Sequence, residues 1–499
     1  HTDISLDNIL SQAEYTTHEL HCKGCNNQCQ VFRYRFANGQ SYYSGNRCEK
    51  VFTNGAKEQP GENAYRFKNE LLFGRAQTQV EHPLLTLGIP RSLNMYENFP
   101  FWHTLFTACG IQVQLSAESD YAAYERNARM VMSDNICFPA KLVHAHVQNL
   151  IEQKVDRIFL PFVIFERKGD EQNSYNWPVV TGYSEVVKSV QAEGIPIDSP
   201  AISFKNRKLL YKQCSKYLTK LGVDENTIKA AFEKATREQE SFGHTLAEHN
   251  RQLLEQTRKK GRWAVLLAGR PYHTDMLIQH KISDILAEMG IDVITDDVVR
   301  EQAQPLEDDV HFLAQWSYPN RILKAAQWSI EQGQDVQFIE MTSFGCGPDA
   351  FLVDEVRDVL IRNGKPFTLL KLDDINNIGS MKLRVRSLIE SMKLFHEHTS
   401  APKEKKEATG LLTSSSDLRH KKILIPFFTP FISPLIPAIM SLAGYDAENL
   451  ALSNTESCEW GLKYANNEVC YPATLIVGDV IKAFKSGKYN PDETVVAMT

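Results

Sequence analysis

The feature that most constrains this chain is a repeated alternation of short apolar runs with helical stretches. The short stretches 84–89 and 157–161, which are mostly apolar, and 112–115, which alternates Gln with Val and Leu, are typical of strands. Helical patterns separate them at 96–109 and 139–153. Strands that alternate with helices form parallel sheets covered by helices on both faces. We therefore predict an α/β protein built from repeated parallel-sheet domains of the Rossmann-like or flavodoxin-like class.

Changes in composition divide the chain into six segments. Two further strand–helix series begin at Trp263 and at Ile423, and the stretches between the series are either highly charged and helical or rich in Lys, Glu and Ser. We predict a Cys-rich metal-binding hairpin unit with its connector at 1–80, a first α/β domain at 81–205, a helical bridge at 206–261, a second α/β domain at 262–400, a linker at 401–421 and a third, truncated α/β unit at 422–499.

The first and third units resemble each other in sequence. The chain reads Asn-Ile-Cys-Phe-Pro-Ala around Cys137 and Glu-Val-Cys-Tyr-Pro-Ala around Cys470. Each loop follows a glycine, Gly110 or Gly444, at a similar distance. This shared register favours an internal repeat.

Composition narrows the classes of partner. Hydrophobic residues make up 42% of the 499 residues, charged residues make up 23%, and the net charge is −6. A nucleic-acid-binding protein would show a basic face, so we expect no nucleic-acid partner.

The charge-free stretch Ile423 to Gly444 contains prolines that would break a continuous helix. It predicts a strand, a turn and a core helix, and no membrane span.

Three cysteines share one local sequence, Cys-x-Pro, at Cys137, Cys346 and Cys470. Proline suits the first helical positions, so each sulfur is expected at the N-terminus of a helix. Free N–H groups and the helix dipole favour an anionic thiolate or cluster there. Each cysteine alone would also fit a small buried residue, and we assign Cys109, Cys214 and Cys458 to packing.

A second group of cysteines lies near the N-terminus, at Cys22, Cys25, Cys29 and Cys48. The alternating run 31–36, the Asn-Gly turn at 38–39 and the return run 41–43 predict a β-hairpin that brings Cys48 back to the other three. Four thiols suit zinc or an iron–sulfur cluster. Ten cysteines in a chain of this size with no visible secretory leader indicate metal or redox chemistry in the cytoplasm.

Two arginine loops follow predicted strands. Arg91 follows the first strand of the first domain, and Arg270, Tyr272 and His273 follow the first strand of the second. Arginine at the carboxyl end of a strand can bind phosphate or carboxylate, although an ion pair within the protein is the simpler role. We expect Arg270, Tyr272 and His273 to line a pocket between the two domains. No phosphate-binding glycine loop of the common kinds occurs in the sequence.

The chain resembles the 2-hydroxyacyl-CoA dehydratase activase family in its large fused form. The matching stretches are Cys22-Lys-Gly-Cys25, Gly45-Asn-Arg-Cys48-Glu-Lys, Gly88-Ile-Pro-Arg91, Leu93-Asn-Met-Tyr96-Glu-Asn98, Cys137-Phe-Pro-Ala-Lys141, Ala268-Gly-Arg-Pro-Tyr-His273, Ser343-Phe-Gly-Cys346-Gly347, Gly461-Leu-Lys-Tyr464, Asn466-Asn467 and Cys470-Tyr-Pro472. The sequence departs from the family at Asn176-Trp177-Pro178, where related chains often have a cysteine before the proline.

The resemblance implies that this chain is the dehydratase-like region that works with ATP-dependent activase domains, on the same full-length chain. It also implies a 4Fe–4S or double-cubane cluster held by Cys137, Cys346 and Cys470, and an acyl-CoA substrate. We hypothesise an iron–sulfur redox component that takes low-potential electrons from the activase. A metal-stabilised scaffold for partners, and a CoA-thioester dehydratase-like enzyme, are the alternatives.

Overall fold

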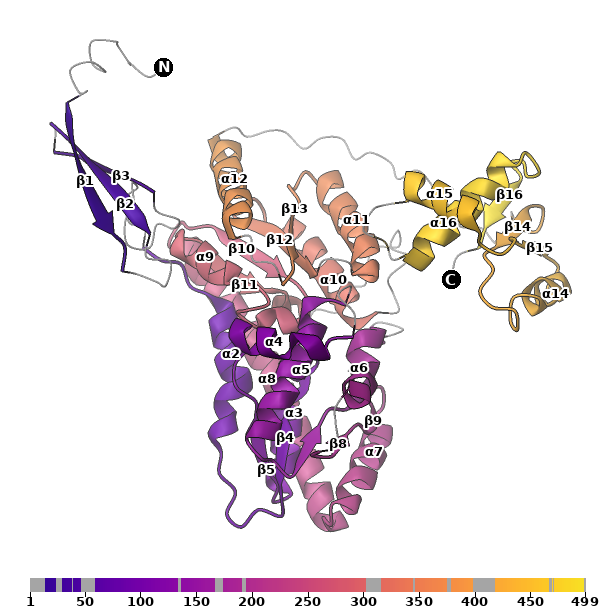
Figure 1. The fold of residues 1–499 in the computed structure, drawn as a ribbon, viewed down its shortest axis with the longest axis horizontal. Coiled ribbons are helices and arrows are strands. Elements are labelled where there is room, and N and C mark those ends of the chain that lie inside the picture. Colours follow the sequence, from indigo (N-terminus) through magenta and orange to yellow (C-terminus); the bar gives the residue numbers. More distant parts are fainter. Residues whose placement is uncertain are drawn as a thin grey trace.

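The computed structural model describes residues 14–23, 29–37, 39–45, 59–132, 136–166, 174–190, 194–301, 316–343, 346–374, 378–397, 418–465, 469 and 471–497. Within these ranges, several parallel sheets and their helices form a mixed α/β protein (Figure 1). The fold class predicted from the alternating pattern is confirmed at this level. No helix in these ranges is long and apolar enough to span a membrane.

A three-stranded antiparallel sheet lies at the N-terminus, with strands β1 (Tyr15–His21), β2 (Gln30–Phe36) and β3 (Ser41–Ser44). The predicted pairing of the second and third strands is present, and Gly39 at their turn has a φ of +84°. The first strand was not predicted, because most of its residues are exposed and it has no buried apolar face.

The first parallel sheet has the strand order β5-β4-β6-β8. Its strands are β4 (Thr86–Ile89), β5 (Gln112–Leu115), β6 (Arg157–Phe159) and β8 (Ile197–Asp198), and β7 (Phe162–Phe165) pairs with β9 (Ala201–Ser203) beside it. The helices and 3-10 turns of this part are α2 (Ala64–Phe73), η1 (Gly74–Gln77), α3 (Met95–Ala108), α4 (Tyr121–Asn127), η2 (Ala128–Met130), α5 (Phe138–Glu152) and α6 (Pro178–Val190).

The second parallel sheet has the corresponding order, β11-β10-β12-β13. Its strands are β10 (Ala264–Ala268), β11 (Asp292–Thr295), β12 (Val336–Ser343) and β13 (Thr368–Leu372). Every residue of β10, β11 and β12 is buried, as expected for strands covered on both faces. The covering elements are η3 (Pro271–Thr274), α9 (Ile282–Glu288), η4 (Asp296–Val299), α10 (Ser317–Glu331), α11 (Gly347–Arg362) and α12 (Ile378–Glu397).

The third parallel sheet has the order β15-β14-β16. Its strands are β14 (Lys422–Ile425), β15 (Asp446–Asn449) and β16 (Thr494–Val496), and its helices are α14 (Leu435–Leu442), α15 (Thr455–Tyr464) and α16 (Tyr471–Lys485). In all three sheets the first strand therefore lies between the second and the third. The prediction that this unit contains a core helix is wrong, because α14 has no buried residue.

The charged helical stretch predicted as a bridge forms α7 (Arg207–Lys220) and the long α8 (Glu225–Lys259). We expected surface helices, but one face of α8 is buried along its whole length, from Ile228 through Phe242 to Leu254. Its N-terminal half packs on α3 and its C-terminal half on η4 and β11. Helix α8 therefore covers elements of both the first and the second sheet, and its charges lie on the opposite face.

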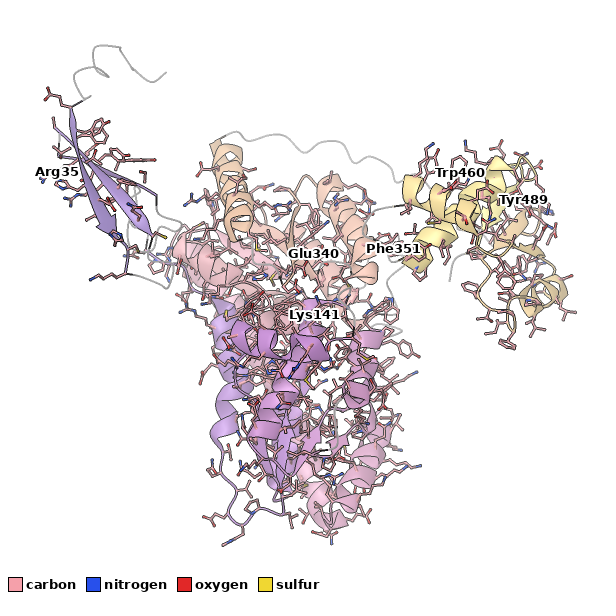
Figure 2. All side chains as sticks on the ribbon, in the orientation of Figure 1. Arg35, Lys141, Glu340, Phe351, Trp460 and Tyr489 are labelled. Atoms are coloured by element: carbon pink, nitrogen blue, oxygen red, sulfur yellow. The ribbon has the colours of Figure 1, made fainter. Side chains whose placement is uncertain are left out.

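The carboxyl ends of the first two sheets face each other across a polar seam. Glu97, near the start of α3, accepts hydrogen bonds from Arg300 at 2.5 and 2.8 Å and from Arg321 at 3.1 Å. Lys141 on α5 lies 2.9 Å from Asp374, which follows β13. Figure 2 labels Lys141 and Glu340 in this central region. The two sheets therefore meet through paired charges.

The Glu97 carboxylate predicts an acid-sensitive seam. Burial opposes its ionisation, but Arg300 and Arg321 outweigh burial and lower its pKa to about 2. Since an unfolded glutamate titrates near ~4.3, this group stabilises the fold above that pH and loses its effect as the pH falls toward 2. The stability difference between the wild type and Glu97→Gln should be on the order of 3 kcal/mol at pH 7 and shrink between pH 5 and 2.

Urea midpoints measured by circular dichroism across this pH range test the prediction. The exposed Glu255 on α8 provides the control, since Glu255→Gln should change the midpoint little at any pH. A Glu97→Gln difference that does not depend on pH would contradict it.

Candidate functional site

Cys137 occupies the N-cap of α5, with Pro139 in the first turn of the helix. Its backbone is extended, with φ −62° and ψ 148°, as expected close before a proline. Its carbonyl oxygen accepts the first helical hydrogen bonds, from the N–H groups of Ala140 and Lys141. The thiol therefore lies where the free N–H groups of the helix N-terminus are concentrated.

Cys346 occupies the same position on α11, with Pro348 in its first turn. The residue comes after β12, the third strand of the second sheet. Arg270 comes after β10, the first strand of that sheet. The order of the strands reverses between β10 and β12, and ligands of open α/β sheets bind at such a point.

The two cysteines are influenced by the charge of the same arginine, although they belong to helices that cover different sheets. The guanidinium of Arg270 reaches the Cys346 sulfur, with Nη2 to Sγ at 3.8 Å. Arg270 also attracts the Cys137 thiolate, and a charge on Cys137 disfavours a charge on Cys346. Tyr272 is affected by both sulfurs. The structure thus brings two of the three Cys-x-Pro sulfurs within interaction range of one arginine.

Asp349 holds the Arg270 side chain in place. The Asp349 carboxylate, in the first turn of α11, forms an ion pair with Arg270 and accepts a hydrogen bond from its Nε at 3.2 Å. The Thr342 hydroxyl donates to the other carboxylate oxygen at 2.6 Å. All three residues are buried. A buried ion pair needs this additional hydrogen bonding to balance its desolvation.

The loop that carries Arg270 is shaped by Gly269 and His273. The Arg270 N–H donates to His273 Nδ1 at 3.0 Å, and the His273 N–H donates to the Arg270 carbonyl at 2.9 Å. A Cβ at Gly269 would lie 2.5 Å from His273 Nδ1, so only glycine leaves room for this closed turn. Pro271 fits the first position of η3.

Both thiols are held in their neutral form in the absence of a bound cation. Burial raises the pKa of the Cys137 thiol, and the Ala140 N–H and Arg270 only partly offset this effect. Burial also raises the pKa of the Cys346 thiol, Asp349 raises it further, and Arg270 lowers it. Neither cysteine therefore has the depressed pKa of a free nucleophile.

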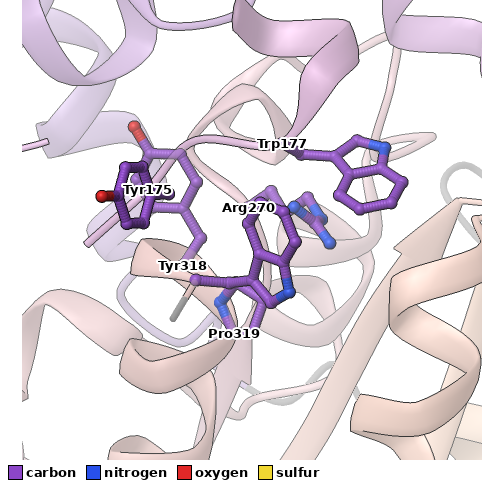
Figure 3. A pocket seen from close by; sticks show the side chains of 6 residues that line it. Tyr175, Trp177, Arg270, Tyr318 and Pro319 are labelled. Atoms are coloured by element: carbon purple, nitrogen blue, oxygen red, sulfur yellow. The ribbon is translucent and has the colours of Figure 1, made fainter. Parts of the chain in front are cut away.

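An aromatic pocket opens next to Arg270. Its lining residues come from the segment before α6, from the start of α10 and the residue before it, and from the Arg270 loop: Tyr175, Trp177, Arg270, Trp316, Tyr318 and Pro319. Figure 3 shows the Arg270 guanidinium among the aromatic rings. The Trp177 and Trp316 rings meet edge to face, with centroids 5.1 Å apart. The empty volume of the pocket is about 190 Å³, below the roughly 300–1,000 Å³ of small-molecule sites, so an apolar group with an oxygen acceptor could enter only if these rings moved apart.

Arg270 is the one member of its predicted group that lines this pocket. Tyr272 packs into the core of the first unit, and His273 is fully buried, with burial lowering its pKa to about 3. We expected both to reach a cleft, but the closed turn of η3 directs them inward. Arg91 forms an ion pair with Glu118 at 3.0 Å and lies over the Phe73 ring, the simpler of its two expected roles.

The N-terminal metal site stays a prediction. Cys22 and Cys29 lie close together, with the Cys22 N–H donating to the Cys29 carbonyl at 2.8 Å, but Cys25 and Cys48 lie outside the described residues. Cys470 lies outside them as well. Within the described ranges, no group of three or more His, Cys, Asp or Glu side chains has metal-binding geometry.

Sequence reasoning missed Asp349, Trp316 and Glu340. An acidic residue in the first turn, as in the run Cys346 to Asp349, is a common helix signal and could have identified Asp349. Glu340 on β12 is fully buried, and burial together with Asp349 raises its pKa well above the usual value. Neither of its carboxyl oxygens has a hydrogen-bond partner among the described residues. Nothing in the sequence distinguishes it from an exposed glutamate.

Comparison with known proteins gives one family. Residues 86–299 match the family described as CoA enzyme activase uncharacterised domain. The match begins at the first residue of β4 and ends at the last residue of η4, so it includes Cys137 and Arg270 but not Cys346. No curated protein matches the chain.

Two solved structures show only distant similarity. A Salmonella typhimurium LT2 protein described as sugar binding is 9% identical, with 68% of this chain and 99% of that chain covered and a TM-score of 0.20. The C-terminal domain of glucosamine-fructose-6-phosphate aminotransferase from Francisella tularensis is 10% identical, with 67% and 95% covered and a TM-score of 0.18. Neither similarity supports an argument about fold or function.

The Arg270–Asp349 pair predicts how the Cys346 thiol titrates. Asp349→Asn removes the charge that raises the pKa of Cys346 and leaves Arg270 free to lower it. The pH profile of Cys346 alkylation by iodoacetamide, followed by mass spectrometry on metal-free protein, should therefore shift to lower pH. Asp354→Asn, at an exposed site on the same helix, is the control and should leave the profile in place. An unchanged profile in Asp349→Asn would show that the pair does not control this thiol.

Proposed function

Because residues 86–299 of this chain belong to the CoA enzyme activase-related family, we propose that the protein is the iron–sulfur redox component of an ATP-dependent CoA-ester dehydratase or reductase system. It would take low-potential electrons from ATP-dependent activase domains. One observation carries the proposal: Cys137 and Cys346 each begin a helix, Arg270 lies 3.8 Å from the Cys346 sulfur, and the charge of Arg270 acts to lower the pKa of both thiols.

The donor set fits an iron–sulfur cluster in kind. Cluster iron takes cysteine thiolates, and the described residues offer two free thiols that both feel the charge of Arg270, with Cys470 as the predicted third ligand. When bound, such a cluster would supply one-electron chemistry at low potential. Metal binding requires the deprotonated thiol, so it would release the two protons that burial holds on Cys137 and Cys346.

The surrounding groups suit a net negative cofactor. Arg270 provides a cation within reach of Cys346, and the first turns of α5 and α11 provide free N–H groups. Positive charge and hydrogen bonds near cluster sulfurs raise a reduction potential, so Arg270 would tune the site. The N-terminal cysteines, Cys22, Cys25, Cys29 and Cys48, would hold a separate zinc or cluster.

The aromatic pocket favours a second candidate function, direct action on an acyl-CoA. The pocket is lined by Arg270, which also contacts Cys346, so an acyl group that entered after Trp177 and Trp316 moved apart would lie near the thiols. No histidine or carboxylate lines this pocket in the described part of the chain, so it offers no general base of the usual kind. We therefore prefer the redox role to direct action on an acyl-CoA.

Iron content tests the proposed ligands. In protein purified without oxygen, Cys137→Ser and Cys346→Ser should each lower bound iron by about four atoms per chain, since a 4Fe–4S cluster is lost as a unit. Cys109→Ser changes a buried cysteine of the first core and should leave the iron content unchanged. Circular dichroism confirms that each variant is folded. Equal iron in all four proteins would exclude the redox role and favour the scaffold alternative.

Tryptophan emission tests the second candidate. Acetyl-CoA should change the emission of the wild type, and Trp177→Phe together with Trp316→Phe should remove most of that change. Trp460→Phe, in the third unit, is the control and should preserve it. If the emission does not respond to acetyl-CoA, direct action on the acyl group loses its support, while the iron analysis still decides the redox role.

A further inference from the structure

The aromatic pocket beside Arg270 lies between two parts of the molecule. We call these parts the first and second units and define them as the first and second parallel sheets with their helices. Tyr175 and Trp177 line the pocket from the first unit, and the other four lining residues belong to the second. Since the pocket is too small for an ordinary ligand, its two sides must part before anything can enter. Entry therefore depends either on movement between the units or on rotation of the rings.

Hydrogen bonds and ring contacts hold the two sides of the pocket together. The Ser317 N–H donates to the Tyr175 carbonyl at 3.0 Å, and the Tyr318 hydroxyl donates to the Glu166 carboxylate at 2.9 Å. The edge-to-face pair of tryptophan rings adds to them. Each of these contacts joins the first unit to the second. Because single contacts of this kind are weak, they can open while both cores stay packed.

Helices α2 and α8 join the two units along one edge. The first residues of α2 pack in the cores of the second unit, and its last residues pack in the core of the first. Helix α8 crosses in the opposite direction, and Phe67 of α2 stacks on His249 of α8 with ring centroids 3.8 Å apart. The η3 loop also reaches the first core, through Tyr272, and it packs on α2 and α3. In Figure 1, α2 lies at the left of the first unit and α6, which begins after Trp177, lies at the right, so the joined edge and the pocket side are apart.

The one glycine of α8 lies where the helix passes from the first unit to the second. Phe242 packs in the first core, and His244 contacts Glu301 of the second unit at 2.7 Å. A Cβ at Gly243 would meet only Arg300 Cδ, at 3.9 Å, among the described residues, so packing does not require glycine here. Glycine in the middle of a helix lowers the stability of the helix and favours bending. Its position at the crossing therefore suits a hinge.

We propose that the first and second units open about Gly243, with α2 and α8 as the hinge, and that this opening admits ligands to the aromatic pocket. The motion parts Trp177 from Trp316 and separates Cys137 from Arg270. Hinged units with a binding site between them commonly close around their ligand in this way. The inference goes beyond the proposed function, because the hinge operates whether the site holds a cluster, an acyl group or neither.

Hydrogen–deuterium exchange on the whole protein, without ligand, tests the hinge. The Ser317 N–H is bonded across the pocket, so its exchange rate follows the open population. In the wild type it should exchange faster than the core amides of β10, which are exposed only by unfolding. Gly243→Ala favours the straight helix and should slow Ser317 exchange by about fivefold. Mass spectrometry with fragmentation to single residues measures the rates.

Two further variants distinguish a hinge from local movement. Thr236→Ala also improves helix propensity, but in the part of α8 that stays with the first unit, and should leave the Ser317 rate unchanged. Asp374→Asn weakens the contact of Asp374 with Lys141, elsewhere between the units, and should speed Ser317 exchange if the units move as bodies. Equal Ser317 rates in the wild type and Gly243→Ala would overturn the proposal. Equal slowing by Thr236→Ala, or no response to Asp374→Asn, would do the same and leave fraying or ring rotation as the route into the pocket.

Discussion

The ion pair between Arg270 and Asp349 is the interaction on which the candidate site depends. It joins the loop after β10 to the first turn of α11, on either side of the point where the strand order reverses. A buried guanidinium without a partner would cost several kcal/mol, so the pair also fixes the relative positions of the two loops. The same Nη2 that bonds Asp349 also lies 3.8 Å from the Cys346 sulfur. The place of the arginine beside the sulfur is thus a consequence of how its charge is balanced.

In the seam between the first two sheets, buried charges are likewise balanced by partners of opposite charge. Glu97 pairs with Arg300 and Arg321, and Asp297 pairs with Lys68 and Arg300. Carboxyl ends of parallel strands carry polar loops, so two sheets that meet at these ends must satisfy many buried charges. Interfaces between domains that are polar rather than hydrophobic are typical of domains that move relative to each other. The thiol site lies on such an interface.

Much of this arrangement could be predicted from the sequence, and the reasons for the failures are physical. The strand at 112–115 and the start of α5 after Cys137 were predicted to within a residue, because an alternating run and an early proline leave few alternatives. The resemblance to the activase-related family is confirmed over residues 86–299. The inward direction of His273 and the pairing of Arg270 with Asp349 depend on contacts between residues far apart in the chain, which local patterns do not encode. The exposure of α14 was missed for a related reason, since an apolar helix without charges is typical of a core.

The protonation of the two thiols decides what kind of chemistry the site can support. A nucleophilic cysteine needs a lowered pKa, and helix N-termini and arginine usually provide it. Here both features are present, yet burial outweighs them and keeps Cys137 and Cys346 neutral. A metal centre changes this balance, because its own positive charge replaces the protons and is far stronger than a single arginine. The geometry that is unsuitable for a free thiolate is therefore well suited to thiolates that exist only as ligands, with Arg270 left to balance the negative charge of the assembled centre.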